Sequence, residues 1–385
     1  MKNVAWKRWT LATLVVALSV GLGLVAVSRI QAQGQEVFLP DGHATNLHRG
    51  PVDMGLIDPA LVGALDIHAH LDPDTPGGGA GEEVRAIDVI NFGRIAKARG
   101  MRGFVHKTHL SMGSAYTALL VRQEVPGLQV FGRMALNLTT GGINPATVDH
   151  YTQITGGWGR LIEMPTRDSE GAGRRFVESG NDPRTWVKLM SPSAPKWVSI
   201  SANGQLLPEV KDLIAKVATI KTANSNGVPA IATGHSTNQE HLLVAREALN
   251  NGVKVVLTHP SQDPKVPEVE EAAKLGAFVE MNASRIVKGA SPTEITSTGD
   301  GAASAVAFIR RIGAEHIIIA TDCGQVTNPY PTDCLALAAK MLRSRGISDR
   351  EIDLMMKENP ATLLSLPPED WRQRLSSVPQ TSSMP

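Results

Sequence analysis

The stretch ALDIHAHLDPD, residues 64–74, decides the fold. It begins as an apolar strand and ends in two histidines one residue apart. Because successive side chains of a strand point to opposite faces, His68 and His70 lie on the same face, close enough to bind one ion. This spacing is typical of a pair of ligands delivered by the end of one strand.

Seven further apolar runs follow this stretch, and longer segments with helical periodicity separate most of them. Together with ALDIH they make eight candidate strands, the others being GFVHKTH (103–109), VFGRMAL (130–136), RLIEM (160–164), VPAIATGH (228–235), VKVVLTH (253–259), AFVEMN (277–282) and HIIIATD (316–322). Short strands that alternate with helices indicate βα units and a parallel sheet. Eight of them predict an α/β fold of the (β/α)8 TIM-barrel type.

Several sequence signals indicate where helices lie. The segment 82–100 keeps its apolar residues at roughly helical spacing from Val84 to Ile95, and a glycine follows it. Two capping boxes mark helix starts, Thr237 with Glu240 and Ser348 with Glu351.

Two strand-like runs lie between the fourth and fifth candidate strands, TWVKLM (185–190) and KWVSIS (196–201). Their short separation predicts a hairpin inserted after strand four, rather than two barrel strands. Trp186 and Trp197 would either wall a pocket at the C-terminal rim of the barrel or pack within the hairpin.

The two ends of the chain differ from its middle. Residues 1–32 combine a basic start, an uncharged stretch and a cleavage point after Ala32, which predicts a signal peptide or an uncleaved N-terminal anchor. The protein is therefore expected to be exported, periplasmic or secreted. Residues 33–58 are expected to form a linker or strapping segment, 59–367 the barrel and 368–385 a tail, with no separate β-sandwich domain.

Composition restricts the partners. The 385 residues are 42% hydrophobic and carry a net charge of +1, so they can build a substantial core. Beyond the N-terminus no dense lysine or arginine run appears, which argues against nucleic acid as a partner. We expect a small-molecule substrate, membrane contact only through an uncleaved N-terminus, and leave a homo-oligomer open. Export would permit the two cysteines, Cys323 and Cys334, to pair, although both could equally be ordinary small residues.

Four of the eight strands end in a residue that binds metals. His68 and His70 end the first strand, His235 the fifth, His259 the sixth and Asp322 the eighth. The C-terminal ends of parallel barrel strands open on one face, so these side chains are expected to converge. Imidazoles with one carboxylate suit a divalent metal, zinc above all, that leaves a position for water and lowers its pKa toward about 7. Asp322 could accept a proton from that water and return it to the leaving group, or could instead cap a helix.

These residues resemble the amidohydrolase superfamily, the metal-dependent hydrolases built on a (β/α)8 barrel. The motif DIHAH, the single histidines after strands five and six, ATD at strand eight and the closing ENPATLLSL carry the resemblance, which spans about residues 61–366. It implies that one metal is held by the first histidine pair and that His235 and His259 bind or flank a second position. It also implies that Asp322 is both a ligand and a proton shuttle.

The resemblance further implies a bridging ligand between two metals, a carboxylated lysine or a glutamate, usually on strand four. Strand four offers only Glu163, whereas strand two offers Lys107 and His109 on one face. Lys107 could be carboxylated or could orient substrate, and Lys188 is a third candidate if its run is really strand four. We favour Lys107. Without a bridge, the resemblance points to a single metal, with His259 contacting substrate or water.

Three functions are compatible with this site. The leading hypothesis is a metal-dependent hydrolase that uses metal-activated water on a C–N, C–O or P–O bond of a small exported substrate. A decarboxylase or lyase on the same barrel is the first alternative. The second is a barrel that binds a ligand or metal without turnover, since a fold does not by itself prove a function.

Overall fold

The computed structural model describes residues 53–74, 85–178, 197–288, 301–326 and 328–371. The predictions for residues 1–32, for most of 33–58 and for all but the start of the tail lie outside the described residues, as do Trp186 and Lys188. Within the described ranges, no helix is long and apolar enough to cross a membrane.

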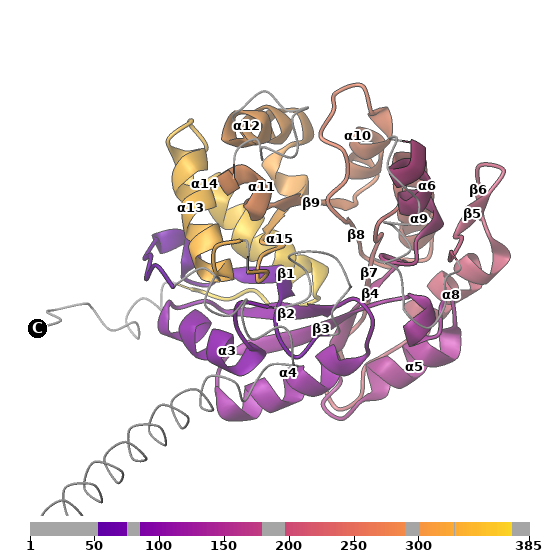
Figure 1. Ribbon diagram of the computed structural model, residues 1–385, viewed down its shortest axis with the longest axis horizontal. Helices are drawn as coiled ribbons and strands as arrows, with labels where there is room; N and C mark the ends of the chain where they lie inside the picture. The colour runs from indigo at the N-terminus through magenta and orange to yellow at the C-terminus, as the bar shows by residue number, and fades with distance from the viewer. Residues whose placement is uncertain (1–52, 75–84, 179–196, 289–300, 327, 372–385) are drawn as a thin grey trace, which may run out of the picture. The chain divides into compact units, whose positions relative to one another are not determined.

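Eight parallel strands form one sheet in the order β1-β2-β3-β4-β7-β8-β9-β10 (Figure 1). Their bounds are β1 Leu65–His70, β2 Gly103–Thr108, β3 Gln129–Ala135, β4 Gly159–Glu163, β7 Ala230–Ala232, β8 Val255–Leu257, β9 Phe278–Asn282 and β10 Ile317–Ala320. Each lies within or largely overlaps one of the eight predicted strands, so the predicted (β/α)8 barrel is confirmed.

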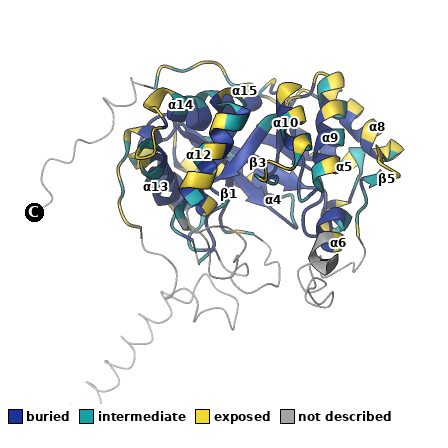
Figure 2. Cartoon of the chain, turned by 90° about the horizontal axis from the view of Figure 1, so that it is seen from above, coloured by how far each residue is buried: buried dark blue, intermediate teal, exposed yellow. Residues whose placement is uncertain are grey.

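Helices separate the strands along the chain, and their outer faces are exposed while the strands are buried (Figure 2). The helices are α3 Val89–Ala98, α4 Gly113–Glu124, α5 Pro145–Gln153, α6 Glu170–Glu178, α8 Pro208–Thr219, α9 Asn238–Asn250, α10 Pro267–Lys274, α11 Ala283–Lys288, α12 Gly301–Ile312, α13 Pro331–Arg343, α14 Asp349–Asp353 and α15 Asn359–Leu363. A π-helical turn, Leu354–Glu358, joins the last two. Both predicted capping boxes are present, at the starts of α9 and α14.

The barrel closes where the end of β10 meets β1. The Asp322 amide donates to the His68 carbonyl, and the His70 amide donates to the Cys323 carbonyl, each at 2.9 Å. Gly324, with φ +121°, makes this approach possible, because a Cβ atom there would lie 1.6 Å from the His70 carbonyl oxygen. The closure therefore positions Asp322 directly beside the two histidines of β1.

The residues that face the interior of the barrel change from apolar to charged along the strands. At one level the barrel is filled by an apolar cluster that includes Ile67, Val105, Phe131, Leu161, Val256 and Ile318. Two residues further along β2, β3, β4 and β9, the inward positions are charged and fully buried: Lys107, Arg133, Glu163 and Glu280. The apolar layer supports the barrel, and the charged layer lies toward the strand ends that carry the candidate ligands.

A hairpin is present after strand four, and among the described residues it shares only Ser201 with the predicted one. The hairpin pairs β5, Ser201–Ala202, with β6, Gln205–Leu206, and Asn203 and Gly204 both have positive φ, as an Asn-Gly hairpin turn requires. The predicted first strand, 185–190, lies outside the described residues. The second predicted strand is wrong in most of its length, because the Val198 amide donates to the Asp168 carbonyl instead, at 2.7 Å.

Two further predictions concern the helix within residues 82–100 and the two cysteines. The helix expected within 82–100 begins only at Val89, because Asp88 caps it and Asp72 exchanges backbone hydrogen bonds with Ile87 and Val89. Cys323 and Cys334 are paired as a disulfide, and both are fully buried.

Candidate metal centre

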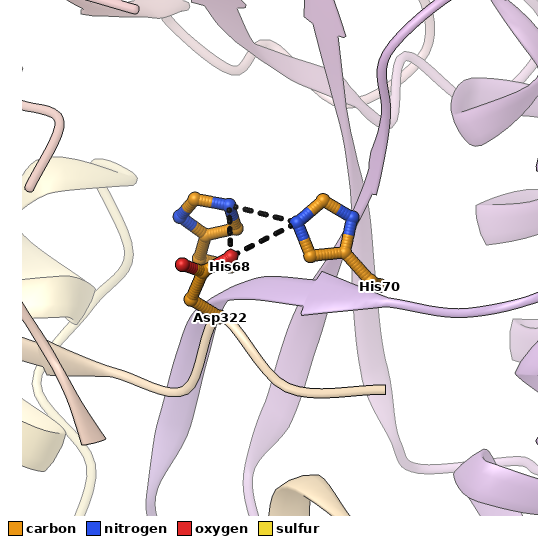
Figure 3. Close-up of side chains that lie close together, drawn as sticks. All are labelled: His68, His70 and Asp322. Atoms are coloured by element: carbon orange, nitrogen blue, oxygen red, sulfur yellow. Dashed lines mark hydrogen bonds and ion pairs between the residues drawn. The ribbon is translucent and has the colours of Figure 1, made fainter. Parts of the chain in front are cut away.

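Three potential ligand atoms converge at the C-terminal end of β1 (Figure 3). His68 Nε2 lies 3.2 Å from His70 Nε2, and Asp322 Oδ1 lies 3.3 Å and 3.1 Å from these two nitrogens. Both histidines are buried, whereas the Asp322 side chain is 25% exposed. The group presents one open side.

A bulge in β1 sets this arrangement. The pairing of β1 with β2 shifts between Asp66 and Ala69. Ile67 belongs to the cluster inside the barrel and Ala69 to the core outside it, so the normal alternation breaks between Ile67 and His68. Both histidines therefore face inward above an apolar support.

Glu280 fixes the proton on the His68 ring. Its Oε1 lies 2.6 Å from His68 Nδ1, while its Oε2 accepts a hydrogen bond from Arg133 at 2.9 Å. A carboxylate only accepts, so Nδ1 carries the proton and Nε2 directs a lone pair toward His70 and Asp322. This is the tautomer that a metal-binding histidine needs.

Asp322 is held from behind by Asn282, whose Nδ2 donates to Oδ2 at 2.7 Å. Oδ1 is left facing the histidines. Asp322 has φ +49°, a conformation that is uncommon for any residue other than glycine and that is typical of functional sites. Burial opposes ionisation of Asp322, but His68 and His70 hold the pKa of its carboxyl well below the usual value.

The surroundings of the two imidazoles favour their neutral forms. Burial, together with the charges of Lys107 and Arg133, holds the pKa of His68 well below its ordinary value. Burial and the charge of Arg85 lower the pKa of His70 to about 4. Neutral imidazoles offer lone pairs at ordinary pH, as metal binding requires.

A cavity of about 190 Å³ lies beside the three ligand atoms. Its lining consists of His70, Lys107, His109, Arg167, His235, His259, Arg285, Asp322 and Gln325. The predicted convergence of the strand-end residues is thus present in the structure. The ring centroids of His235 and His259 are 5.1 Å apart, and those of His259 and His68 are 5.9 Å apart.

His235 and His259 are placed differently from the first three residues. Among the described residues, only His68, His70 and Asp322 form a compact group of metal-binding atoms. Burial holds the pKa of His235 well below its ordinary value and lowers that of His259 to about 4. Both histidines line the cavity, and their lowered pKa values favour the neutral imidazole.

The candidates for a bridging ligand fall in different places. Lys107 lines the cavity, is fully buried, and lies 3.3 Å from Glu163 Oε1. Glu163 is fully buried, accepts from Arg133 at 2.6 Å, and is not among the described lining residues. His109 lines the cavity with Nδ1 3.0 Å from Thr166 Oγ1. Lys188 lies outside the described residues.

Trp197 does not line this cavity. It packs against α6, where a Cβ atom added to Gly173 would lie 1.1 Å from the Trp197 ring. Neither predicted role is therefore the one that the structure shows for Trp197, which contacts a helix and lies outside the hairpin of β5 and β6.

Sequence reasoning missed several residues that shape the site. They are Arg133 and Glu280 inside the strands, Asn282 at the end of β9, and Arg167 and Arg285 on the cavity wall. For Arg133 and Glu280 the sequence did hold a signal, a charged residue within an otherwise apolar barrel strand. Burying a charge is costly unless it is paired, so such a residue indicates a buried ion pair. No comparable signal marks the two arginines of the wall.

The donor set fits a divalent metal ion. Two imidazole nitrogens and one carboxylate oxygen lie within hydrogen-bond distance of one another, and the His68 proton points away from them. The buried His70 Nδ1 has no hydrogen-bond partner among the described residues. Imidazole and carboxylate ligands with an open side are typical of a catalytic zinc site.

Two solved structures show the same fold. An amidohydrolase from Burkholderia multivorans with bound zinc is 13% identical, with 79% of this chain and 99% of that chain covered and a TM-score of 0.52. Organophosphorus hydrolase from Deinococcus radiodurans is 15% identical, with 82% of this chain and 96% of that chain covered and a TM-score of 0.50. The expected resemblance to amidohydrolase barrels is therefore confirmed for the fold.

No curated protein matches the chain. Residues 63–280, more than half of the sequence, match the model of a family of unknown function, DUF6282. The matched part contains both histidines of β1, His235 and His259, whereas Asp322 lies beyond it. The chain therefore belongs to DUF6282, a family of unknown function.

Proposed function

We propose that this protein is a metal-dependent hydrolase acting on a C–N, C–O or P–O bond of a small molecule. The observation that carries the proposal is the convergence of His68 Nε2, His70 Nε2 and Asp322 Oδ1 within 3.3 Å, beside a cavity. A divalent ion, zinc above all, would supply Lewis acidity there and would lower the pKa of a water molecule toward about 7. The hydrolase names of the two structures with this fold agree with the proposal.

Asp322 is proposed to be the proton carrier. Asn282 binds one of its oxygens, which leaves the other directed toward the site, and a quarter of its side chain is exposed. A carboxylate that is oriented and ionised in this way can take a proton from water and return it to the leaving group. His259 lines the same cavity, which supports a role in contacting water or substrate.

We propose one ion per chain. The trio of His68, His70 and Asp322 is preformed, whereas His235 and His259 join no compact group of metal-binding atoms among the described residues. Lys107 is engaged with Glu163, which supports a role in orienting substrate rather than in bridging two ions. Export remains part of the proposal, because residues 1–32 have the composition of a signal or anchor.

The test is turnover by the full chain loaded with zinc. A panel of small lactones, amides, phosphoesters and carboxylic acids is incubated with loaded protein, with chelated protein and with protein reloaded after chelation. We expect hydrolysis of at least one class, lost on chelation and restored by zinc. Release of carbon dioxide without hydrolysis would favour a decarboxylase, and metal binding without any turnover across the panel would favour the non-catalytic alternative.

A further inference from the structure

The cavity wall carries more positive than negative charge. Among the described lining residues, Lys107, Arg167 and Arg285 are cationic and Asp322 is the only carboxylate. Glu163 lies beside Lys107 and offsets its charge. Arg167 and Arg285 are the other cationic groups of the described wall.

Arg167 lies in a loop whose neighbouring residues are hydrogen-bonded. It follows β4, and its neighbours Thr166 and Asp168 both donate backbone N–H groups to Asn137 Oδ1, at 2.9 Å and 3.1 Å. Asp168 in turn accepts from the Leu138 amide at 2.7 Å. Arg167 is itself 5% exposed and lines the cavity. A buried guanidinium in a hydrogen-bonded loop is prepared to bind without much loss of conformational freedom.

Arg285 reaches the same cavity from another element. It lies on α11, directly after β9, and is exposed. No ion pair joins Arg285 to another described residue, although its charge is felt at His259. Arg167 and Arg285 thus reach one small space from the ends of two different strands.

We propose that the substrate carries an oxyanion, a carboxylate or a phosphate, that Arg167 and Arg285 bind while the bond to be cleaved lies at His70 and Asp322. This inference rests on the proposed function and specifies its substrate class. Guanidinium groups match the planar geometry of carboxylates and phosphates and bind them in charge-assisted pairs. A cavity of about 190 Å³ is smaller than the range usual for drug-sized ligands, so the anion belongs to a small molecule.

The experiment is calorimetric titration of the full zinc-loaded chain with three probes: glutarate, its neutral analogue glutaramide, and inorganic phosphate. The variants are Arg285→Gln and Arg167→Gln, and the control is Arg246→Gln, an exposed arginine of α9 that pairs with Glu271. Zinc content is measured for every protein. Arg285 is exposed, so its variant keeps the test valid even if Arg167→Gln fails to fold.

We expect glutarate or phosphate to bind, glutaramide to bind about tenfold more weakly or worse, and each cavity variant to lose about tenfold or more in anion affinity. Zinc content should stay unchanged in all of them, and Arg246→Gln should bind like the wild type. The stronger of the two anions identifies the substrate group as carboxylate or phosphate.

The proposal is overturned if neither anion binds, or if Arg285→Gln binds both as tightly as Arg246→Gln. That failure is distinct from failure of the proposed function. A chain that binds zinc through His68 and hydrolyses a neutral substrate would keep the function and lose the oxyanion site.

Discussion

The two sides of the barrel mouth use similar residues to different effect. On the side where β1 meets β10, His68, His70 and Asp322 lie within 3.3 Å of one another. On the side of β7 and β8, His235 and His259 have ring centroids 5.1 Å apart and join no compact group among the described residues. A histidine at the end of a barrel strand is therefore not enough to form a compact group of potential ligand atoms among the described residues.

The difference lies in the support behind each group. The first side has a bulge in β1, a Gly324 that allows close closure, and Glu280 and Asn282 behind the ligands. Such outer partners orient ligands and tune their affinity. We infer that the first side holds the ion and that the second shapes the space for substrate.

The largest expected effect is that of Asp322→Asn on turnover. The amide keeps the size of the side chain but cannot accept and return a proton, so kcat should fall by about 10² to 10⁴. Steady-state rates of the zinc-loaded variant on the best substrate of the panel measure this. The comparison of the two sides breaks if His259→Asn lowers kcat by more than Asp322→Asn does.

The second prediction distinguishes the orientation of His68 by Glu280 from the burial of a carboxylate alone. Glu280→Gln removes a carboxylate that contacts both His68 and Arg133, and it should lower zinc affinity about 10- to 100-fold. Glu163→Gln is the matched control, because Glu163 is equally buried and also accepts from Arg133 but does not contact His68. Competition with a chromophoric chelator gives both affinities.

Equal losses of zinc affinity in these two variants would show that general damage to the buried charge layer, and not orientation of His68, is responsible. Unfolding midpoints in urea measure that damage separately. Breaking a buried ion pair typically costs about 3 to 5 kcal/mol, so both variants are expected to be destabilised.

The smallest expected effect is the loss of folding stability in acid that is due to His259, on the side of β7 and β8. The pKa of His259 is about 4 in the folded protein and about 6.5 in an unfolded chain, so the unfolded state binds more protons between these values. The contribution of this imidazole to the free energy of unfolding is therefore fully present above pH 6.5. As the pH drops below that value, it falls by about 1.4 kcal/mol per pH unit. His259→Asn removes this contribution, and asparagine tolerates the local φ of +29°.

Urea unfolding of the chelated protein at pH 7, 6 and 5 checks this prediction. The wild type should lose stability more steeply than His259→Asn across that range. Identical pH dependence in the two proteins would mean that the ring of His259 is not buried as a neutral group.

The sequence was sufficient for the barrel, because each strand is a short apolar run and each run is separate. It also predicted the histidines, the lysine and the aspartate of the cavity wall, since strand ends share one face of a barrel, but not its two arginines. The bulge that turns His68 inward, and the pairing of Arg133 with Glu280, depend on contacts across the barrel and leave no local pattern. The Asn203-Gly204 turn, by contrast, was a readable signal of the inserted hairpin.

The most direct test of the central claim is elemental metal analysis of three purified full-length proteins: the wild type, His68→Ala and His235→Ala. We predict one zinc-like ion per chain in the wild type, none in His68→Ala, and one still in His235→Ala, with all three folded by circular dichroism. A folded His68→Ala protein that keeps its full metal content would contradict the metal centre described above.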